Sequence, residues 1–330
     1  MASNELTAHV IAMKYLHSMP LYRMETYFQM MDVTLSRQTL SNWIINSASE
    51  LECVYNCMKD ELLKSSYIHA DETPVKVIDS KGKESKSKHY MWVYVSDKPE
   101  SSIILYDYQK TRSNSCPVQF LGEFSGYLQT DGYSGYNKIE YAKRLYCLAH
   151  IRRKFYDIIS GLHGEALKQS RAIIWFNYCD KLYSIEKDLR EQYSDCDNYY
   201  DDRHRIRLEK SLPIFNEFQK YVDTEIENAL PASALGKALS YTQKLLPSMK
   251  VFFTNGILEI DNNAAERAVK LFVIGRKNWL FSNTPKGAKS SAIIYSIIET
   301  AKANSLVVEK YLIYLFNILS KTENRDMHLL

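Results

Sequence analysis

The stretch YIHADETPV, residues 67–75, is where the hydrophobic pattern of the chain changes from helical to extended. From Tyr67 onward the side chains alternate in character, and a period of two predicts a β-strand. The alternation puts His69, Asp71 and Thr73 on one face of this strand and Glu72 on the other. We therefore expect Asp71 to contribute to a site, and Glu72 to pack or to bind a basic neighbour.

Four more strand-like runs follow within the next eighty residues or so. The pattern predicts strands at 67–77, 89–96, 102–109, 126–131 and 144–148, with a short helix at 116–124. A polar loop at 80–88 joins the first two strands, which predicts an antiparallel pair. Three antiparallel strands, a helix and two further strands match the ribonuclease-H-like plan. In that plan the first and fourth strands lie side by side, which would bring Asp71 close to Asp131.

Helical patterns flank these strands. Residues 7–64 show a 3.6-residue period, and Ser36 is a plausible N-cap for a long helix that begins with Arg37 and Gln38. A helix, a turn and a second helix suit a helix-turn-helix that reads the major groove of DNA; the alternative is a helical hairpin for packing or dimerisation. The polar segment 195–205 is expected to be an exposed connection, and residues 271–283 a strand or loop.

Three acidic residues in different settings could form one site. Asp71 and Asp131 end strand-like runs, and Glu266 opens a helix that starts at Asn263. Each has a structural alternative: a strand-end residue, an ordinary Asp-Gly turn, and a capping box with Asn263. Carboxylate-only clusters hold hard divalent cations, and two such ions can clamp the attacking and leaving oxygens of a phosphate. Together the three acids predict metal-dependent cleavage of phosphodiester bonds.

Basic side chains accompany these acids. Between residues 264 and 290, Glu266 is the only acid, and the basic residues are Arg267, Lys270, Arg276, Lys277, Lys286 and Lys289. A second basic cluster, residues 152–154, follows His150. Such strips suit a phosphate backbone. His150 would orient a phosphate or a metal-bound water, or else be hydrogen-bonded structure; Trp279 would stack on an unpaired base or be buried.

The composition narrows the class of protein. The 42 Lys and Arg against 39 Asp and Glu give a formal charge of only +3, so any affinity for nucleic acid must come from local clusters. Apolar residues at 45% exclude a wholly disordered chain. No apolar run reaches the roughly 20 residues that span a bilayer, and the start does not look like a secretory signal. The 6 cysteines lack Cys-x-x-Cys spacing, which favours a reducing cytoplasm.

Five ordered motifs resemble the DDE transposases of the insertion-sequence-66 type. They are HADETPV at 69–75, LQTDGY at 128–133, CLAHIRRKF at 147–155, LEIDNNAAER at 258–267 and GRKNWLF at 275–281. Residues 21–23 and 35–40 are similar to the helical region ahead of that family's catalytic core, and residues 297–304 look like its C-terminal helix. The resemblance spans nearly the whole chain.

The resemblance implies a nucleoid-associated DNA transposase whose catalytic and metal-binding triad is Asp71, Asp131 and Glu266. The triad would hold two Mg²⁺ ions, for which Mn²⁺ can substitute. The partners would be double-stranded DNA (transposon ends and target), a second copy or more of the chain, and accessory proteins of the element, with no membrane. Full-length members carry an N-terminal zinc-binding segment that this sequence starts after, so we expect a shortened form or a fragment. The expected DNA-binding residues are Arg37, Gln38, His150, Arg152, Arg153, Lys154, Arg267, Lys270, Arg276, Lys277 and Trp279.

The predicted fold is α/β, with a mixed five-stranded ribonuclease-H-like sheet and helices on both faces. The predicted parts are a helical, helix-turn-helix-like N-terminal region (1–65), the first part of the catalytic core (66–150), a helical insertion (151–250), the rest of the core (251–303) and a C-terminal helix (304–330). Two other functions stay open. One is a nuclease of the same fold without strand transfer, and the other is a non-catalytic DNA-binding regulator that acts through residues 21–64.

Overall fold

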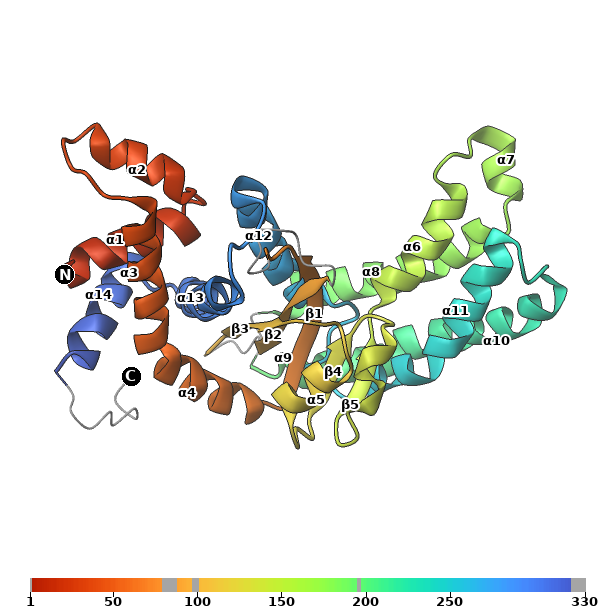
Figure 1. The fold of residues 1–330 in the computed structure, drawn as a ribbon. Helices are drawn as coiled ribbons and strands as arrows, with labels where there is room; N and C mark the ends of the chain where they lie inside the picture. Colours follow the sequence, from red (N-terminus) through yellow and green to blue (C-terminus); the bar gives the residue numbers. More distant parts are fainter. Residues whose placement is uncertain (1, 79–87, 97–100, 195–196, 322–330) are drawn as a thin grey trace. The chain divides into compact units, whose positions relative to one another are not determined.

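The computed structural model describes residues 2–78, 88–96, 101–194 and 197–321, and most of the predicted loop at 80–88 lies outside them. The strands are β1 (Tyr67–Val75), β2 (His89–Ser96), β3 (Ile103–Gln109), β4 (Tyr127–Thr130) and β5 (Lys143–Tyr146). They follow the order β3-β2-β1-β4-β5 in one sheet. The fold is therefore α/β with a mixed five-stranded sheet, whose strands are labelled in Figure 1. The order has the first strand next to the fourth, as predicted.

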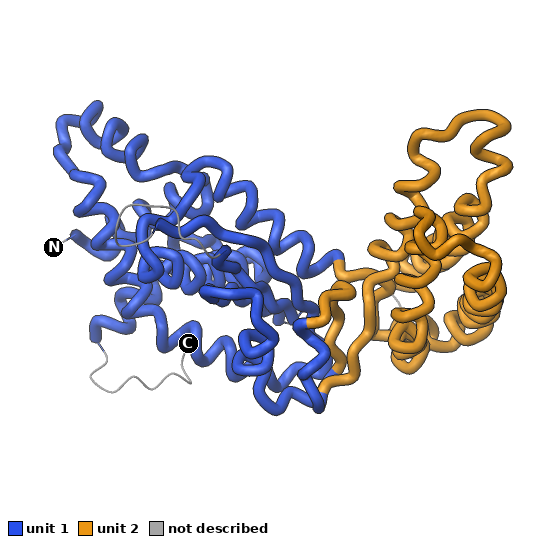
Figure 2. The backbone as a smooth tube through the Cα atoms, turned by 45° about the vertical axis from the view of Figure 1, so that its right-hand side comes forward, with its two compact units in different colours: residues 1–126, 135–141, 263–330 blue, residues 127–134, 142–262 orange. Residues whose placement is uncertain are grey.

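The chain divides into two compact units, which Figure 2 distinguishes by colour. Unit 1 consists of Met1–Gly126, Gly135–Tyr141 and Asn263–Leu330, and unit 2 consists of Tyr127–Ser134 and Ala142–Asn262. Unit 2 thus contains most of the helical segment that the sequence predicts between the strands and Glu266. None of the helices in the described part of the chain is long and apolar enough to cross a membrane.

In unit 1, β1, β2 and β3 form an antiparallel sheet. Asp71 on β1 lies opposite Val93 on β2, and Val93 lies opposite Tyr106 on β3. Helix α13 (Pro285–Ala303) packs on β3, and α12 (Asn263–Trp279) packs on β1 and β2. The other α-helices in the described part of unit 1 are α1 (Asn4–Tyr15), α2 (Leu21–Gln29), α3 (Arg37–Glu50), α4 (Glu52–Leu63), α5 (Ser115–Leu121) and α14 (Val308–Leu319), and the 3₁₀-helix η1 (Ser134–Lys138) follows β4.

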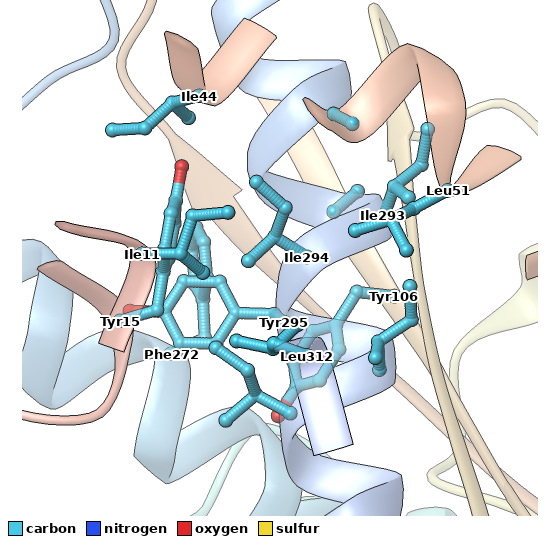
Figure 3. Close-up of a cluster of buried hydrophobic side chains, with 14 of the residues drawn as sticks. Ile11, Tyr15, Ile44, Leu51, Tyr106, Phe272, Ile293, Ile294, Tyr295 and Leu312 are labelled. Atoms are coloured by element: carbon cyan, nitrogen blue, oxygen red, sulfur yellow. The ribbon is translucent and has the colours of Figure 1, made fainter. Parts of the chain in front are cut away.

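The core of unit 1 is built around Tyr295 of α13 (Figure 3). Its ring meets Tyr15 of α1 edge-on, with 5.0 Å between ring centroids, and Phe272 of α12 at 5.5 Å. Gly275 of α12 allows this approach, because a Cβ there would lie 2.2 Å from the Tyr295 hydroxyl oxygen. Aromatic contacts therefore join α1, α12 and α13 in the core of unit 1.

Local signals in the sequence explain several helix ends. The hydroxyl of Ser36 accepts a hydrogen bond from the backbone N–H of Thr39 at 3.1 Å, which confirms the predicted N-cap of α3. Asn304 is the C-cap of α13. The connection between α2 and α3 spans residues 30–36, which is longer than the turn of about 3–4 residues usual in a helix-turn-helix.

Unit 2 joins a parallel strand pair to a bundle of helices. Tyr127 of β4 lies opposite Lys143 of β5. The helices are α6 (Leu148–Ile159), α7 (Gly164–Gln169), α8 (Ala172–Tyr193), α9 (Tyr199–Ile206), the π-helix η2 (Arg207–Ser211), α10 (Leu212–Asn228), α11 (Ala234–Met249) and the 3₁₀-helix η3 (Lys250–Thr254). The buried Trp175 of α8 packs against Phe155 of α6 at 5.6 Å and Phe218 of α10 at 5.7 Å, so one aromatic centre joins three helices.

Two local predictions are wrong. Residues 271–279 are not a strand or loop, because α12 continues to Trp279. The segment predicted as an exposed connection at 195–205 contains α9, and Arg203 within it is 1% exposed; residues 195–196 lie outside the described chain. In both cases tertiary packing of the helix overrides a weak or polar local pattern.

Candidate active site

Asp71 lies in the middle of β1 and not at the end of a strand, as the sequence suggested. Its carboxylate oxygen Oδ1 accepts a hydrogen bond from the backbone N–H of Glu72 at 2.8 Å. The side chain is neither fully buried nor fully exposed. A carboxylate held by its own backbone in this way has a restricted orientation, which is what a ligand for a hard cation requires.

Glu72, the adjacent acid, has a different role. Its side chain is 1% exposed and forms an ion pair with Arg112, whose Nε donates to Oε1 at 2.7 Å. The hydroxyl of Tyr136 donates to Oε2 at 2.7 Å. The expectation that Glu72 binds a basic neighbour is confirmed. This carboxylate is committed to holding β1 to the segments that carry Arg112 and Tyr136.

Glu266 lies in the first turn of α12, which packs against β1 and β2 within unit 1. Two contacts fix the position of this helix. The Tyr106 hydroxyl donates to the backbone carbonyl of Ala268 at 2.8 Å, and the Arg276 guanidinium donates to the carbonyl of Pro74 on β1. Asp71 and Glu266 therefore belong to neighbouring elements of the same unit, and the Glu266 side chain is half-buried.

Asp131 belongs to unit 2 and follows β4 directly. Its Oδ1 accepts a hydrogen bond from the backbone N–H of Tyr133 at 2.9 Å, the turn geometry that the Asp-Gly sequence favours. Arg144 of β5 donates to the hydroxyl of Thr130 at 2.9 Å, which ties the end of β4 to its neighbour. The turn holds the Asp131 carboxylate at the end of the strand without burying it.

Tyr241 of α11 is a residue near Asp131 that the sequence did not indicate. A Cβ on Gly132 would lie 2.7 Å from the Tyr241 hydroxyl oxygen, so the phenol packs directly over the turn. Burial, and then the charge of Asp131, raise the pKa of Tyr241 to about 12. The hydroxyl is therefore a neutral hydrogen-bond donor at physiological pH. No local pattern distinguishes Tyr241 from the other tyrosines of the chain, because its contact with Gly132 joins segments that are remote in sequence.

The predicted DNA-binding residues of α6 have different environments. Arg152 pairs with Asp180 of α8 at 2.7 Å and lies over the ring of Phe176 at 4.2 Å. His150 is half-buried in the first turn of α6, whereas Arg153 and Lys154 are exposed. Within α6, Arg153 and Lys154 are thus the cations most accessible to a ligand.

Of the residues of unit 1 that were predicted to bind DNA, some are exposed and others contact the protein itself. Arg267, Lys270 and Lys277 are exposed on α12. Arg276 is bonded to β1 as described above, and Trp279 meets the ring of Tyr15 edge-on at 6.3 Å. At the N-terminus of α3, Arg37 pairs with Glu25 at 3.0 Å and the Gln38 amide donates to Asn42 at 2.8 Å. Packing thus engages Arg276 and Trp279 within the protein, and their contacts to DNA stay a prediction.

A buried charge cluster in unit 2 was not foreseen. Glu186 of α8 is 0% exposed and binds two arginines, Arg203 at 2.8 Å and Arg207 at 2.7 Å. Burial by itself would raise the pKa of Glu186, but the hydrogen bonds and charges of Arg207 and Arg203 outweigh it and lower the pKa. The sequence of α9 and η2 does not indicate this cluster, because only the fold brings Arg203 and Arg207 to Glu186.

The same arginines hold the segment 255–262, which leads directly into α12. Both Arg203 and Arg207 donate to the backbone carbonyl of Gly256, at 3.2 and 3.4 Å. A Cβ at Gly256 would lie 1.8 Å from the carbonyl oxygen of Tyr200, so only glycine fits there. Arg203 and Arg190 both bind the Glu259 carboxylate, at 2.8 Å each. These contacts fix the segment along its length.

Farther along, backbone groups of the same segment form hydrogen bonds with β4 and with the start of α6. The amide of Gln129 donates to the carbonyl of Glu259, and the N–H of Leu148 donates to the carbonyl of Ile260, both at 3.0 Å. The N–H of Asn262 contacts the Cys147 sulfur at 3.2 Å. The residues just before α12 are therefore anchored in unit 2 by side chains and backbone together.

Glu259 gives this anchor a pH dependence. Burial would raise its pKa, but the hydrogen bonds and charges of Arg203 and Arg190 outweigh it and lower the pKa from 4.5 to about 2. A depressed carboxyl pKa stabilises the fold above the unfolded value, and the contribution is lost as pH falls from about 4.5 to about 2. We expect Glu259→Gln to reduce the pH dependence of the unfolding free energy in this window. Urea unfolding at stepped pH measures it; identical pH profiles for the two proteins would contradict it.

Comparison with known proteins places the chain. A family model described as "Transposase IS66 family" matches residues 1–290. The chain belongs to the IS66 transposase family. All three predicted acids and all five motifs of the sequence lie within the matched range. No solved structure matches the chain significantly.

Relatives of this IS66 family chain include proteins of Sinorhizobium fredii (strain NBRC 101917 / NGR234). The chain is 28% identical over 320 residues to "Uncharacterized protein y4qI", covering 92% of this chain and 57% of that protein. It is 29% identical over 320 residues to "Uncharacterized protein y4jD", covering 93% of this chain and 60% of that protein. The chain therefore spans a little under two thirds of the length of these curated relatives.

Proposed function

We propose that this chain carries the catalytic core of a DNA transposase. It would cut phosphodiester bonds at the ends of an insertion sequence and join the freed 3′-hydroxyls to target DNA. The observation that carries the proposal is the family match, which contains all three acids in order. The placement of Asp71 and Glu266 on packed elements of unit 1, with Glu72 committed elsewhere, supports it. The sheet is proposed to be ribonuclease-H-like.

The chemistry of the donor set fits a hard divalent cation. Asp71, Asp131 and Glu266 offer only carboxylate oxygens, and each side chain is partly accessible to solvent. These three residues would hold the metal, and they are proposed to share a pair of Mg²⁺ ions, with Mn²⁺ able to substitute. When bound, the ions supply an activated water and stabilise the charge on the phosphate.

Backbone N–H groups orient two of the three acids. The backbone N–H of Glu72 orients Asp71, and the N–H of Tyr133 orients Asp131. Each oxygen is therefore placed before substrate binds, which lowers the entropic cost of assembling the site. The exposed cations Arg267, Lys270 and Lys277 are proposed to bind the DNA backbone.

The DNA partners are proposed to be transposon ends and a target duplex. Two or more copies of the chain would assemble on them, because two ends must be cut and joined together. Accessory proteins of the element are further candidate partners. Contacts to the backbone alone carry no sequence information, so recognition of the ends requires contacts to base edges.

The test is a reaction of the purified chain with DNA that bears the ends of its own element, a target plasmid and Mg²⁺. We expect Mg²⁺-dependent release of 3′-hydroxyls at the ends and a covalent product that links donor to target. Chelation of the metal should stop both. Cleavage without a joined product would favour the nuclease of the same fold. Absence of cleavage with both Mg²⁺ and Mn²⁺ would contradict the proposal.

A further inference from the structure

We propose that one face of α11 in unit 2 binds the DNA backbone and guides it to Asp131. The α11 face, as we define it, comprises Lys237, Tyr241 and Lys244 of α11 with Arg153 and Lys154 of α6. The inference rests on the proposed function, because the backbone is that of the DNA to be cut. It assigns a binding role to a helix on which the sequence indicated no site.

The spacing of the α11 residues gives the face its geometry. Lys237, Tyr241 and Lys244 are separated by four and three positions, so their side chains lie on one side of the helix. Both lysines are exposed. At 1.5 Å per residue the two lysines are about 10 Å apart along the axis, which matches the rise of about three phosphates in one strand of duplex DNA.

Helix α6 adds two cations at the centre of the face. α11 packs against α6 within unit 2. The Nζ of Lys154 lies 5.5 Å from the centre of the Tyr241 ring, and Arg153 is close enough for its charge to act on the same phenol. The four cations thus gather around one tyrosine, and that tyrosine packs over Gly132, next to Asp131.

The cations of the α11 face are unpaired within the described residues, as are Lys181, Lys210 and Lys220 elsewhere in unit 2. α11 contains no acidic residue. Within the described residues, Arg153, Lys154, Lys237 and Lys244 form no ion pair, whereas many other exposed cations of unit 2 do. The paired cations are Arg152 (with Asp180), Lys168 (with Glu165), Arg171 (with Glu225), Lys187 (with Glu191), Arg190 (with Glu259) and Arg205 (with Asp202 and Glu209).

Four neighbouring cations that form no ion pair repel one another, and a polyanion relieves that repulsion. The proximity of Asp131 favours the phosphodiester backbone as that polyanion. The Tyr241 hydroxyl can donate a hydrogen bond to a phosphate oxygen. The face would therefore bind all sequences alike and set where the backbone passes the acid.

The test compares Lys237→Gln/Lys244→Gln with the wild-type full chain by fluorescence anisotropy, on a duplex that bears the element's end and on an unrelated duplex. We expect weaker binding to both duplexes. The slope of log K against log salt should fall in magnitude by about 1.8, that is, about 0.9 for each of two lost phosphate contacts. The matched control is Lys210→Gln/Lys220→Gln, which removes the same charge from η2 and α10 and should leave the slope unchanged.

A second variant, Tyr241→Phe, keeps the ring over Gly132 and removes only the hydroxyl. We expect it to fold normally and to bind both duplexes more weakly with a wild-type salt slope, because no charge is lost.

A wild-type affinity and slope for the double lysine variant, or an equal loss in its control, would overturn the inference. If the lysine variants behave as expected but the wild type never cuts DNA, the proposed function fails and the binding face stands. If the wild type cuts and the double variant binds normally, the face alone fails.

Discussion

Asp71→Asn and Glu266→Gln are each expected to lower the rate of Mg²⁺-dependent DNA cleavage by more than about 100-fold. That figure is the upper end of the loss seen when only a partner of a metal ligand is changed, and these residues are proposed to be the ligands themselves. Both substitutions keep the shape of the side chain and remove one negative charge. Both substitutions leave the exposed cations that are proposed to bind DNA unchanged. The affinity for an end-bearing duplex should therefore remain close to that of the wild type.

Glu72→Gln is the matched control for Asp71→Asn, because it makes the same chemical change at the next residue of β1. Here the carboxylate is buried and bonded to Arg112 and Tyr136. The expected result is therefore a loss of unfolding free energy of about 1–3 kcal/mol, the usual cost of leaving a buried polar group poorly satisfied. The fraction of the Glu72→Gln protein that is folded should still cut DNA.

Single-turnover cleavage and urea unfolding measure the two effects separately. Cleavage at the wild-type rate by Asp71→Asn or by Glu266→Gln would show that the acid is not a ligand. A Glu72→Gln protein that is fully stable but inactive would show that Glu72, and not Asp71, takes part in the chemistry.

Glu186→Gln is expected to destabilise unit 2 by about 3–5 kcal/mol, the cost of removing one partner from a buried ion pair. The carboxylate binds both Arg203, 1% exposed, and Arg207, 0% exposed. In the variant no carboxylate faces Arg207, whose other acceptors are the uncharged backbone carbonyls of Asn255 and Gly256. A buried guanidinium cannot shed its proton, so the cost must appear as lost stability.

Hydrogen exchange of the amides in α8, α9 and η2 reports the stability of this region without assuming that the two units unfold together. Protection there should decrease strongly in Glu186→Gln. The control is Arg205→Ala, which breaks exposed pairs with Asp202 and Glu209 and should cost about 0–1 kcal/mol. If Glu186→Gln lost no more protection than Arg205→Ala, the cluster would not be what holds the segment 255–262.

The helix α12 shows why part of the fold could not be read from the sequence. Its residues 271–279 include Val273, Ile274 and Gly275, which locally favour a strand or a bend. In the protein, the rings of Tyr295 and Trp279 lie so close to Gly275 that a Cβ there would be only 2.2 Å from the Tyr295 hydroxyl oxygen and 2.4 Å from the Trp279 ring. The burial gained by that close packing exceeds the weak local preference against the helix.

The sequence by itself determined the strand positions, the caps at Ser36 and Asn304, and the binding of Glu72 to a basic neighbour. These follow from periodicity and from hydrogen bonds between residues close together in the chain. Only the tertiary structure decided that Arg203 and Arg207 meet Glu186, and that Tyr241 packs over Gly132. Such contacts join segments that are remote in sequence, and a polar or aromatic side chain carries no local mark of the partner that folding will bring to it.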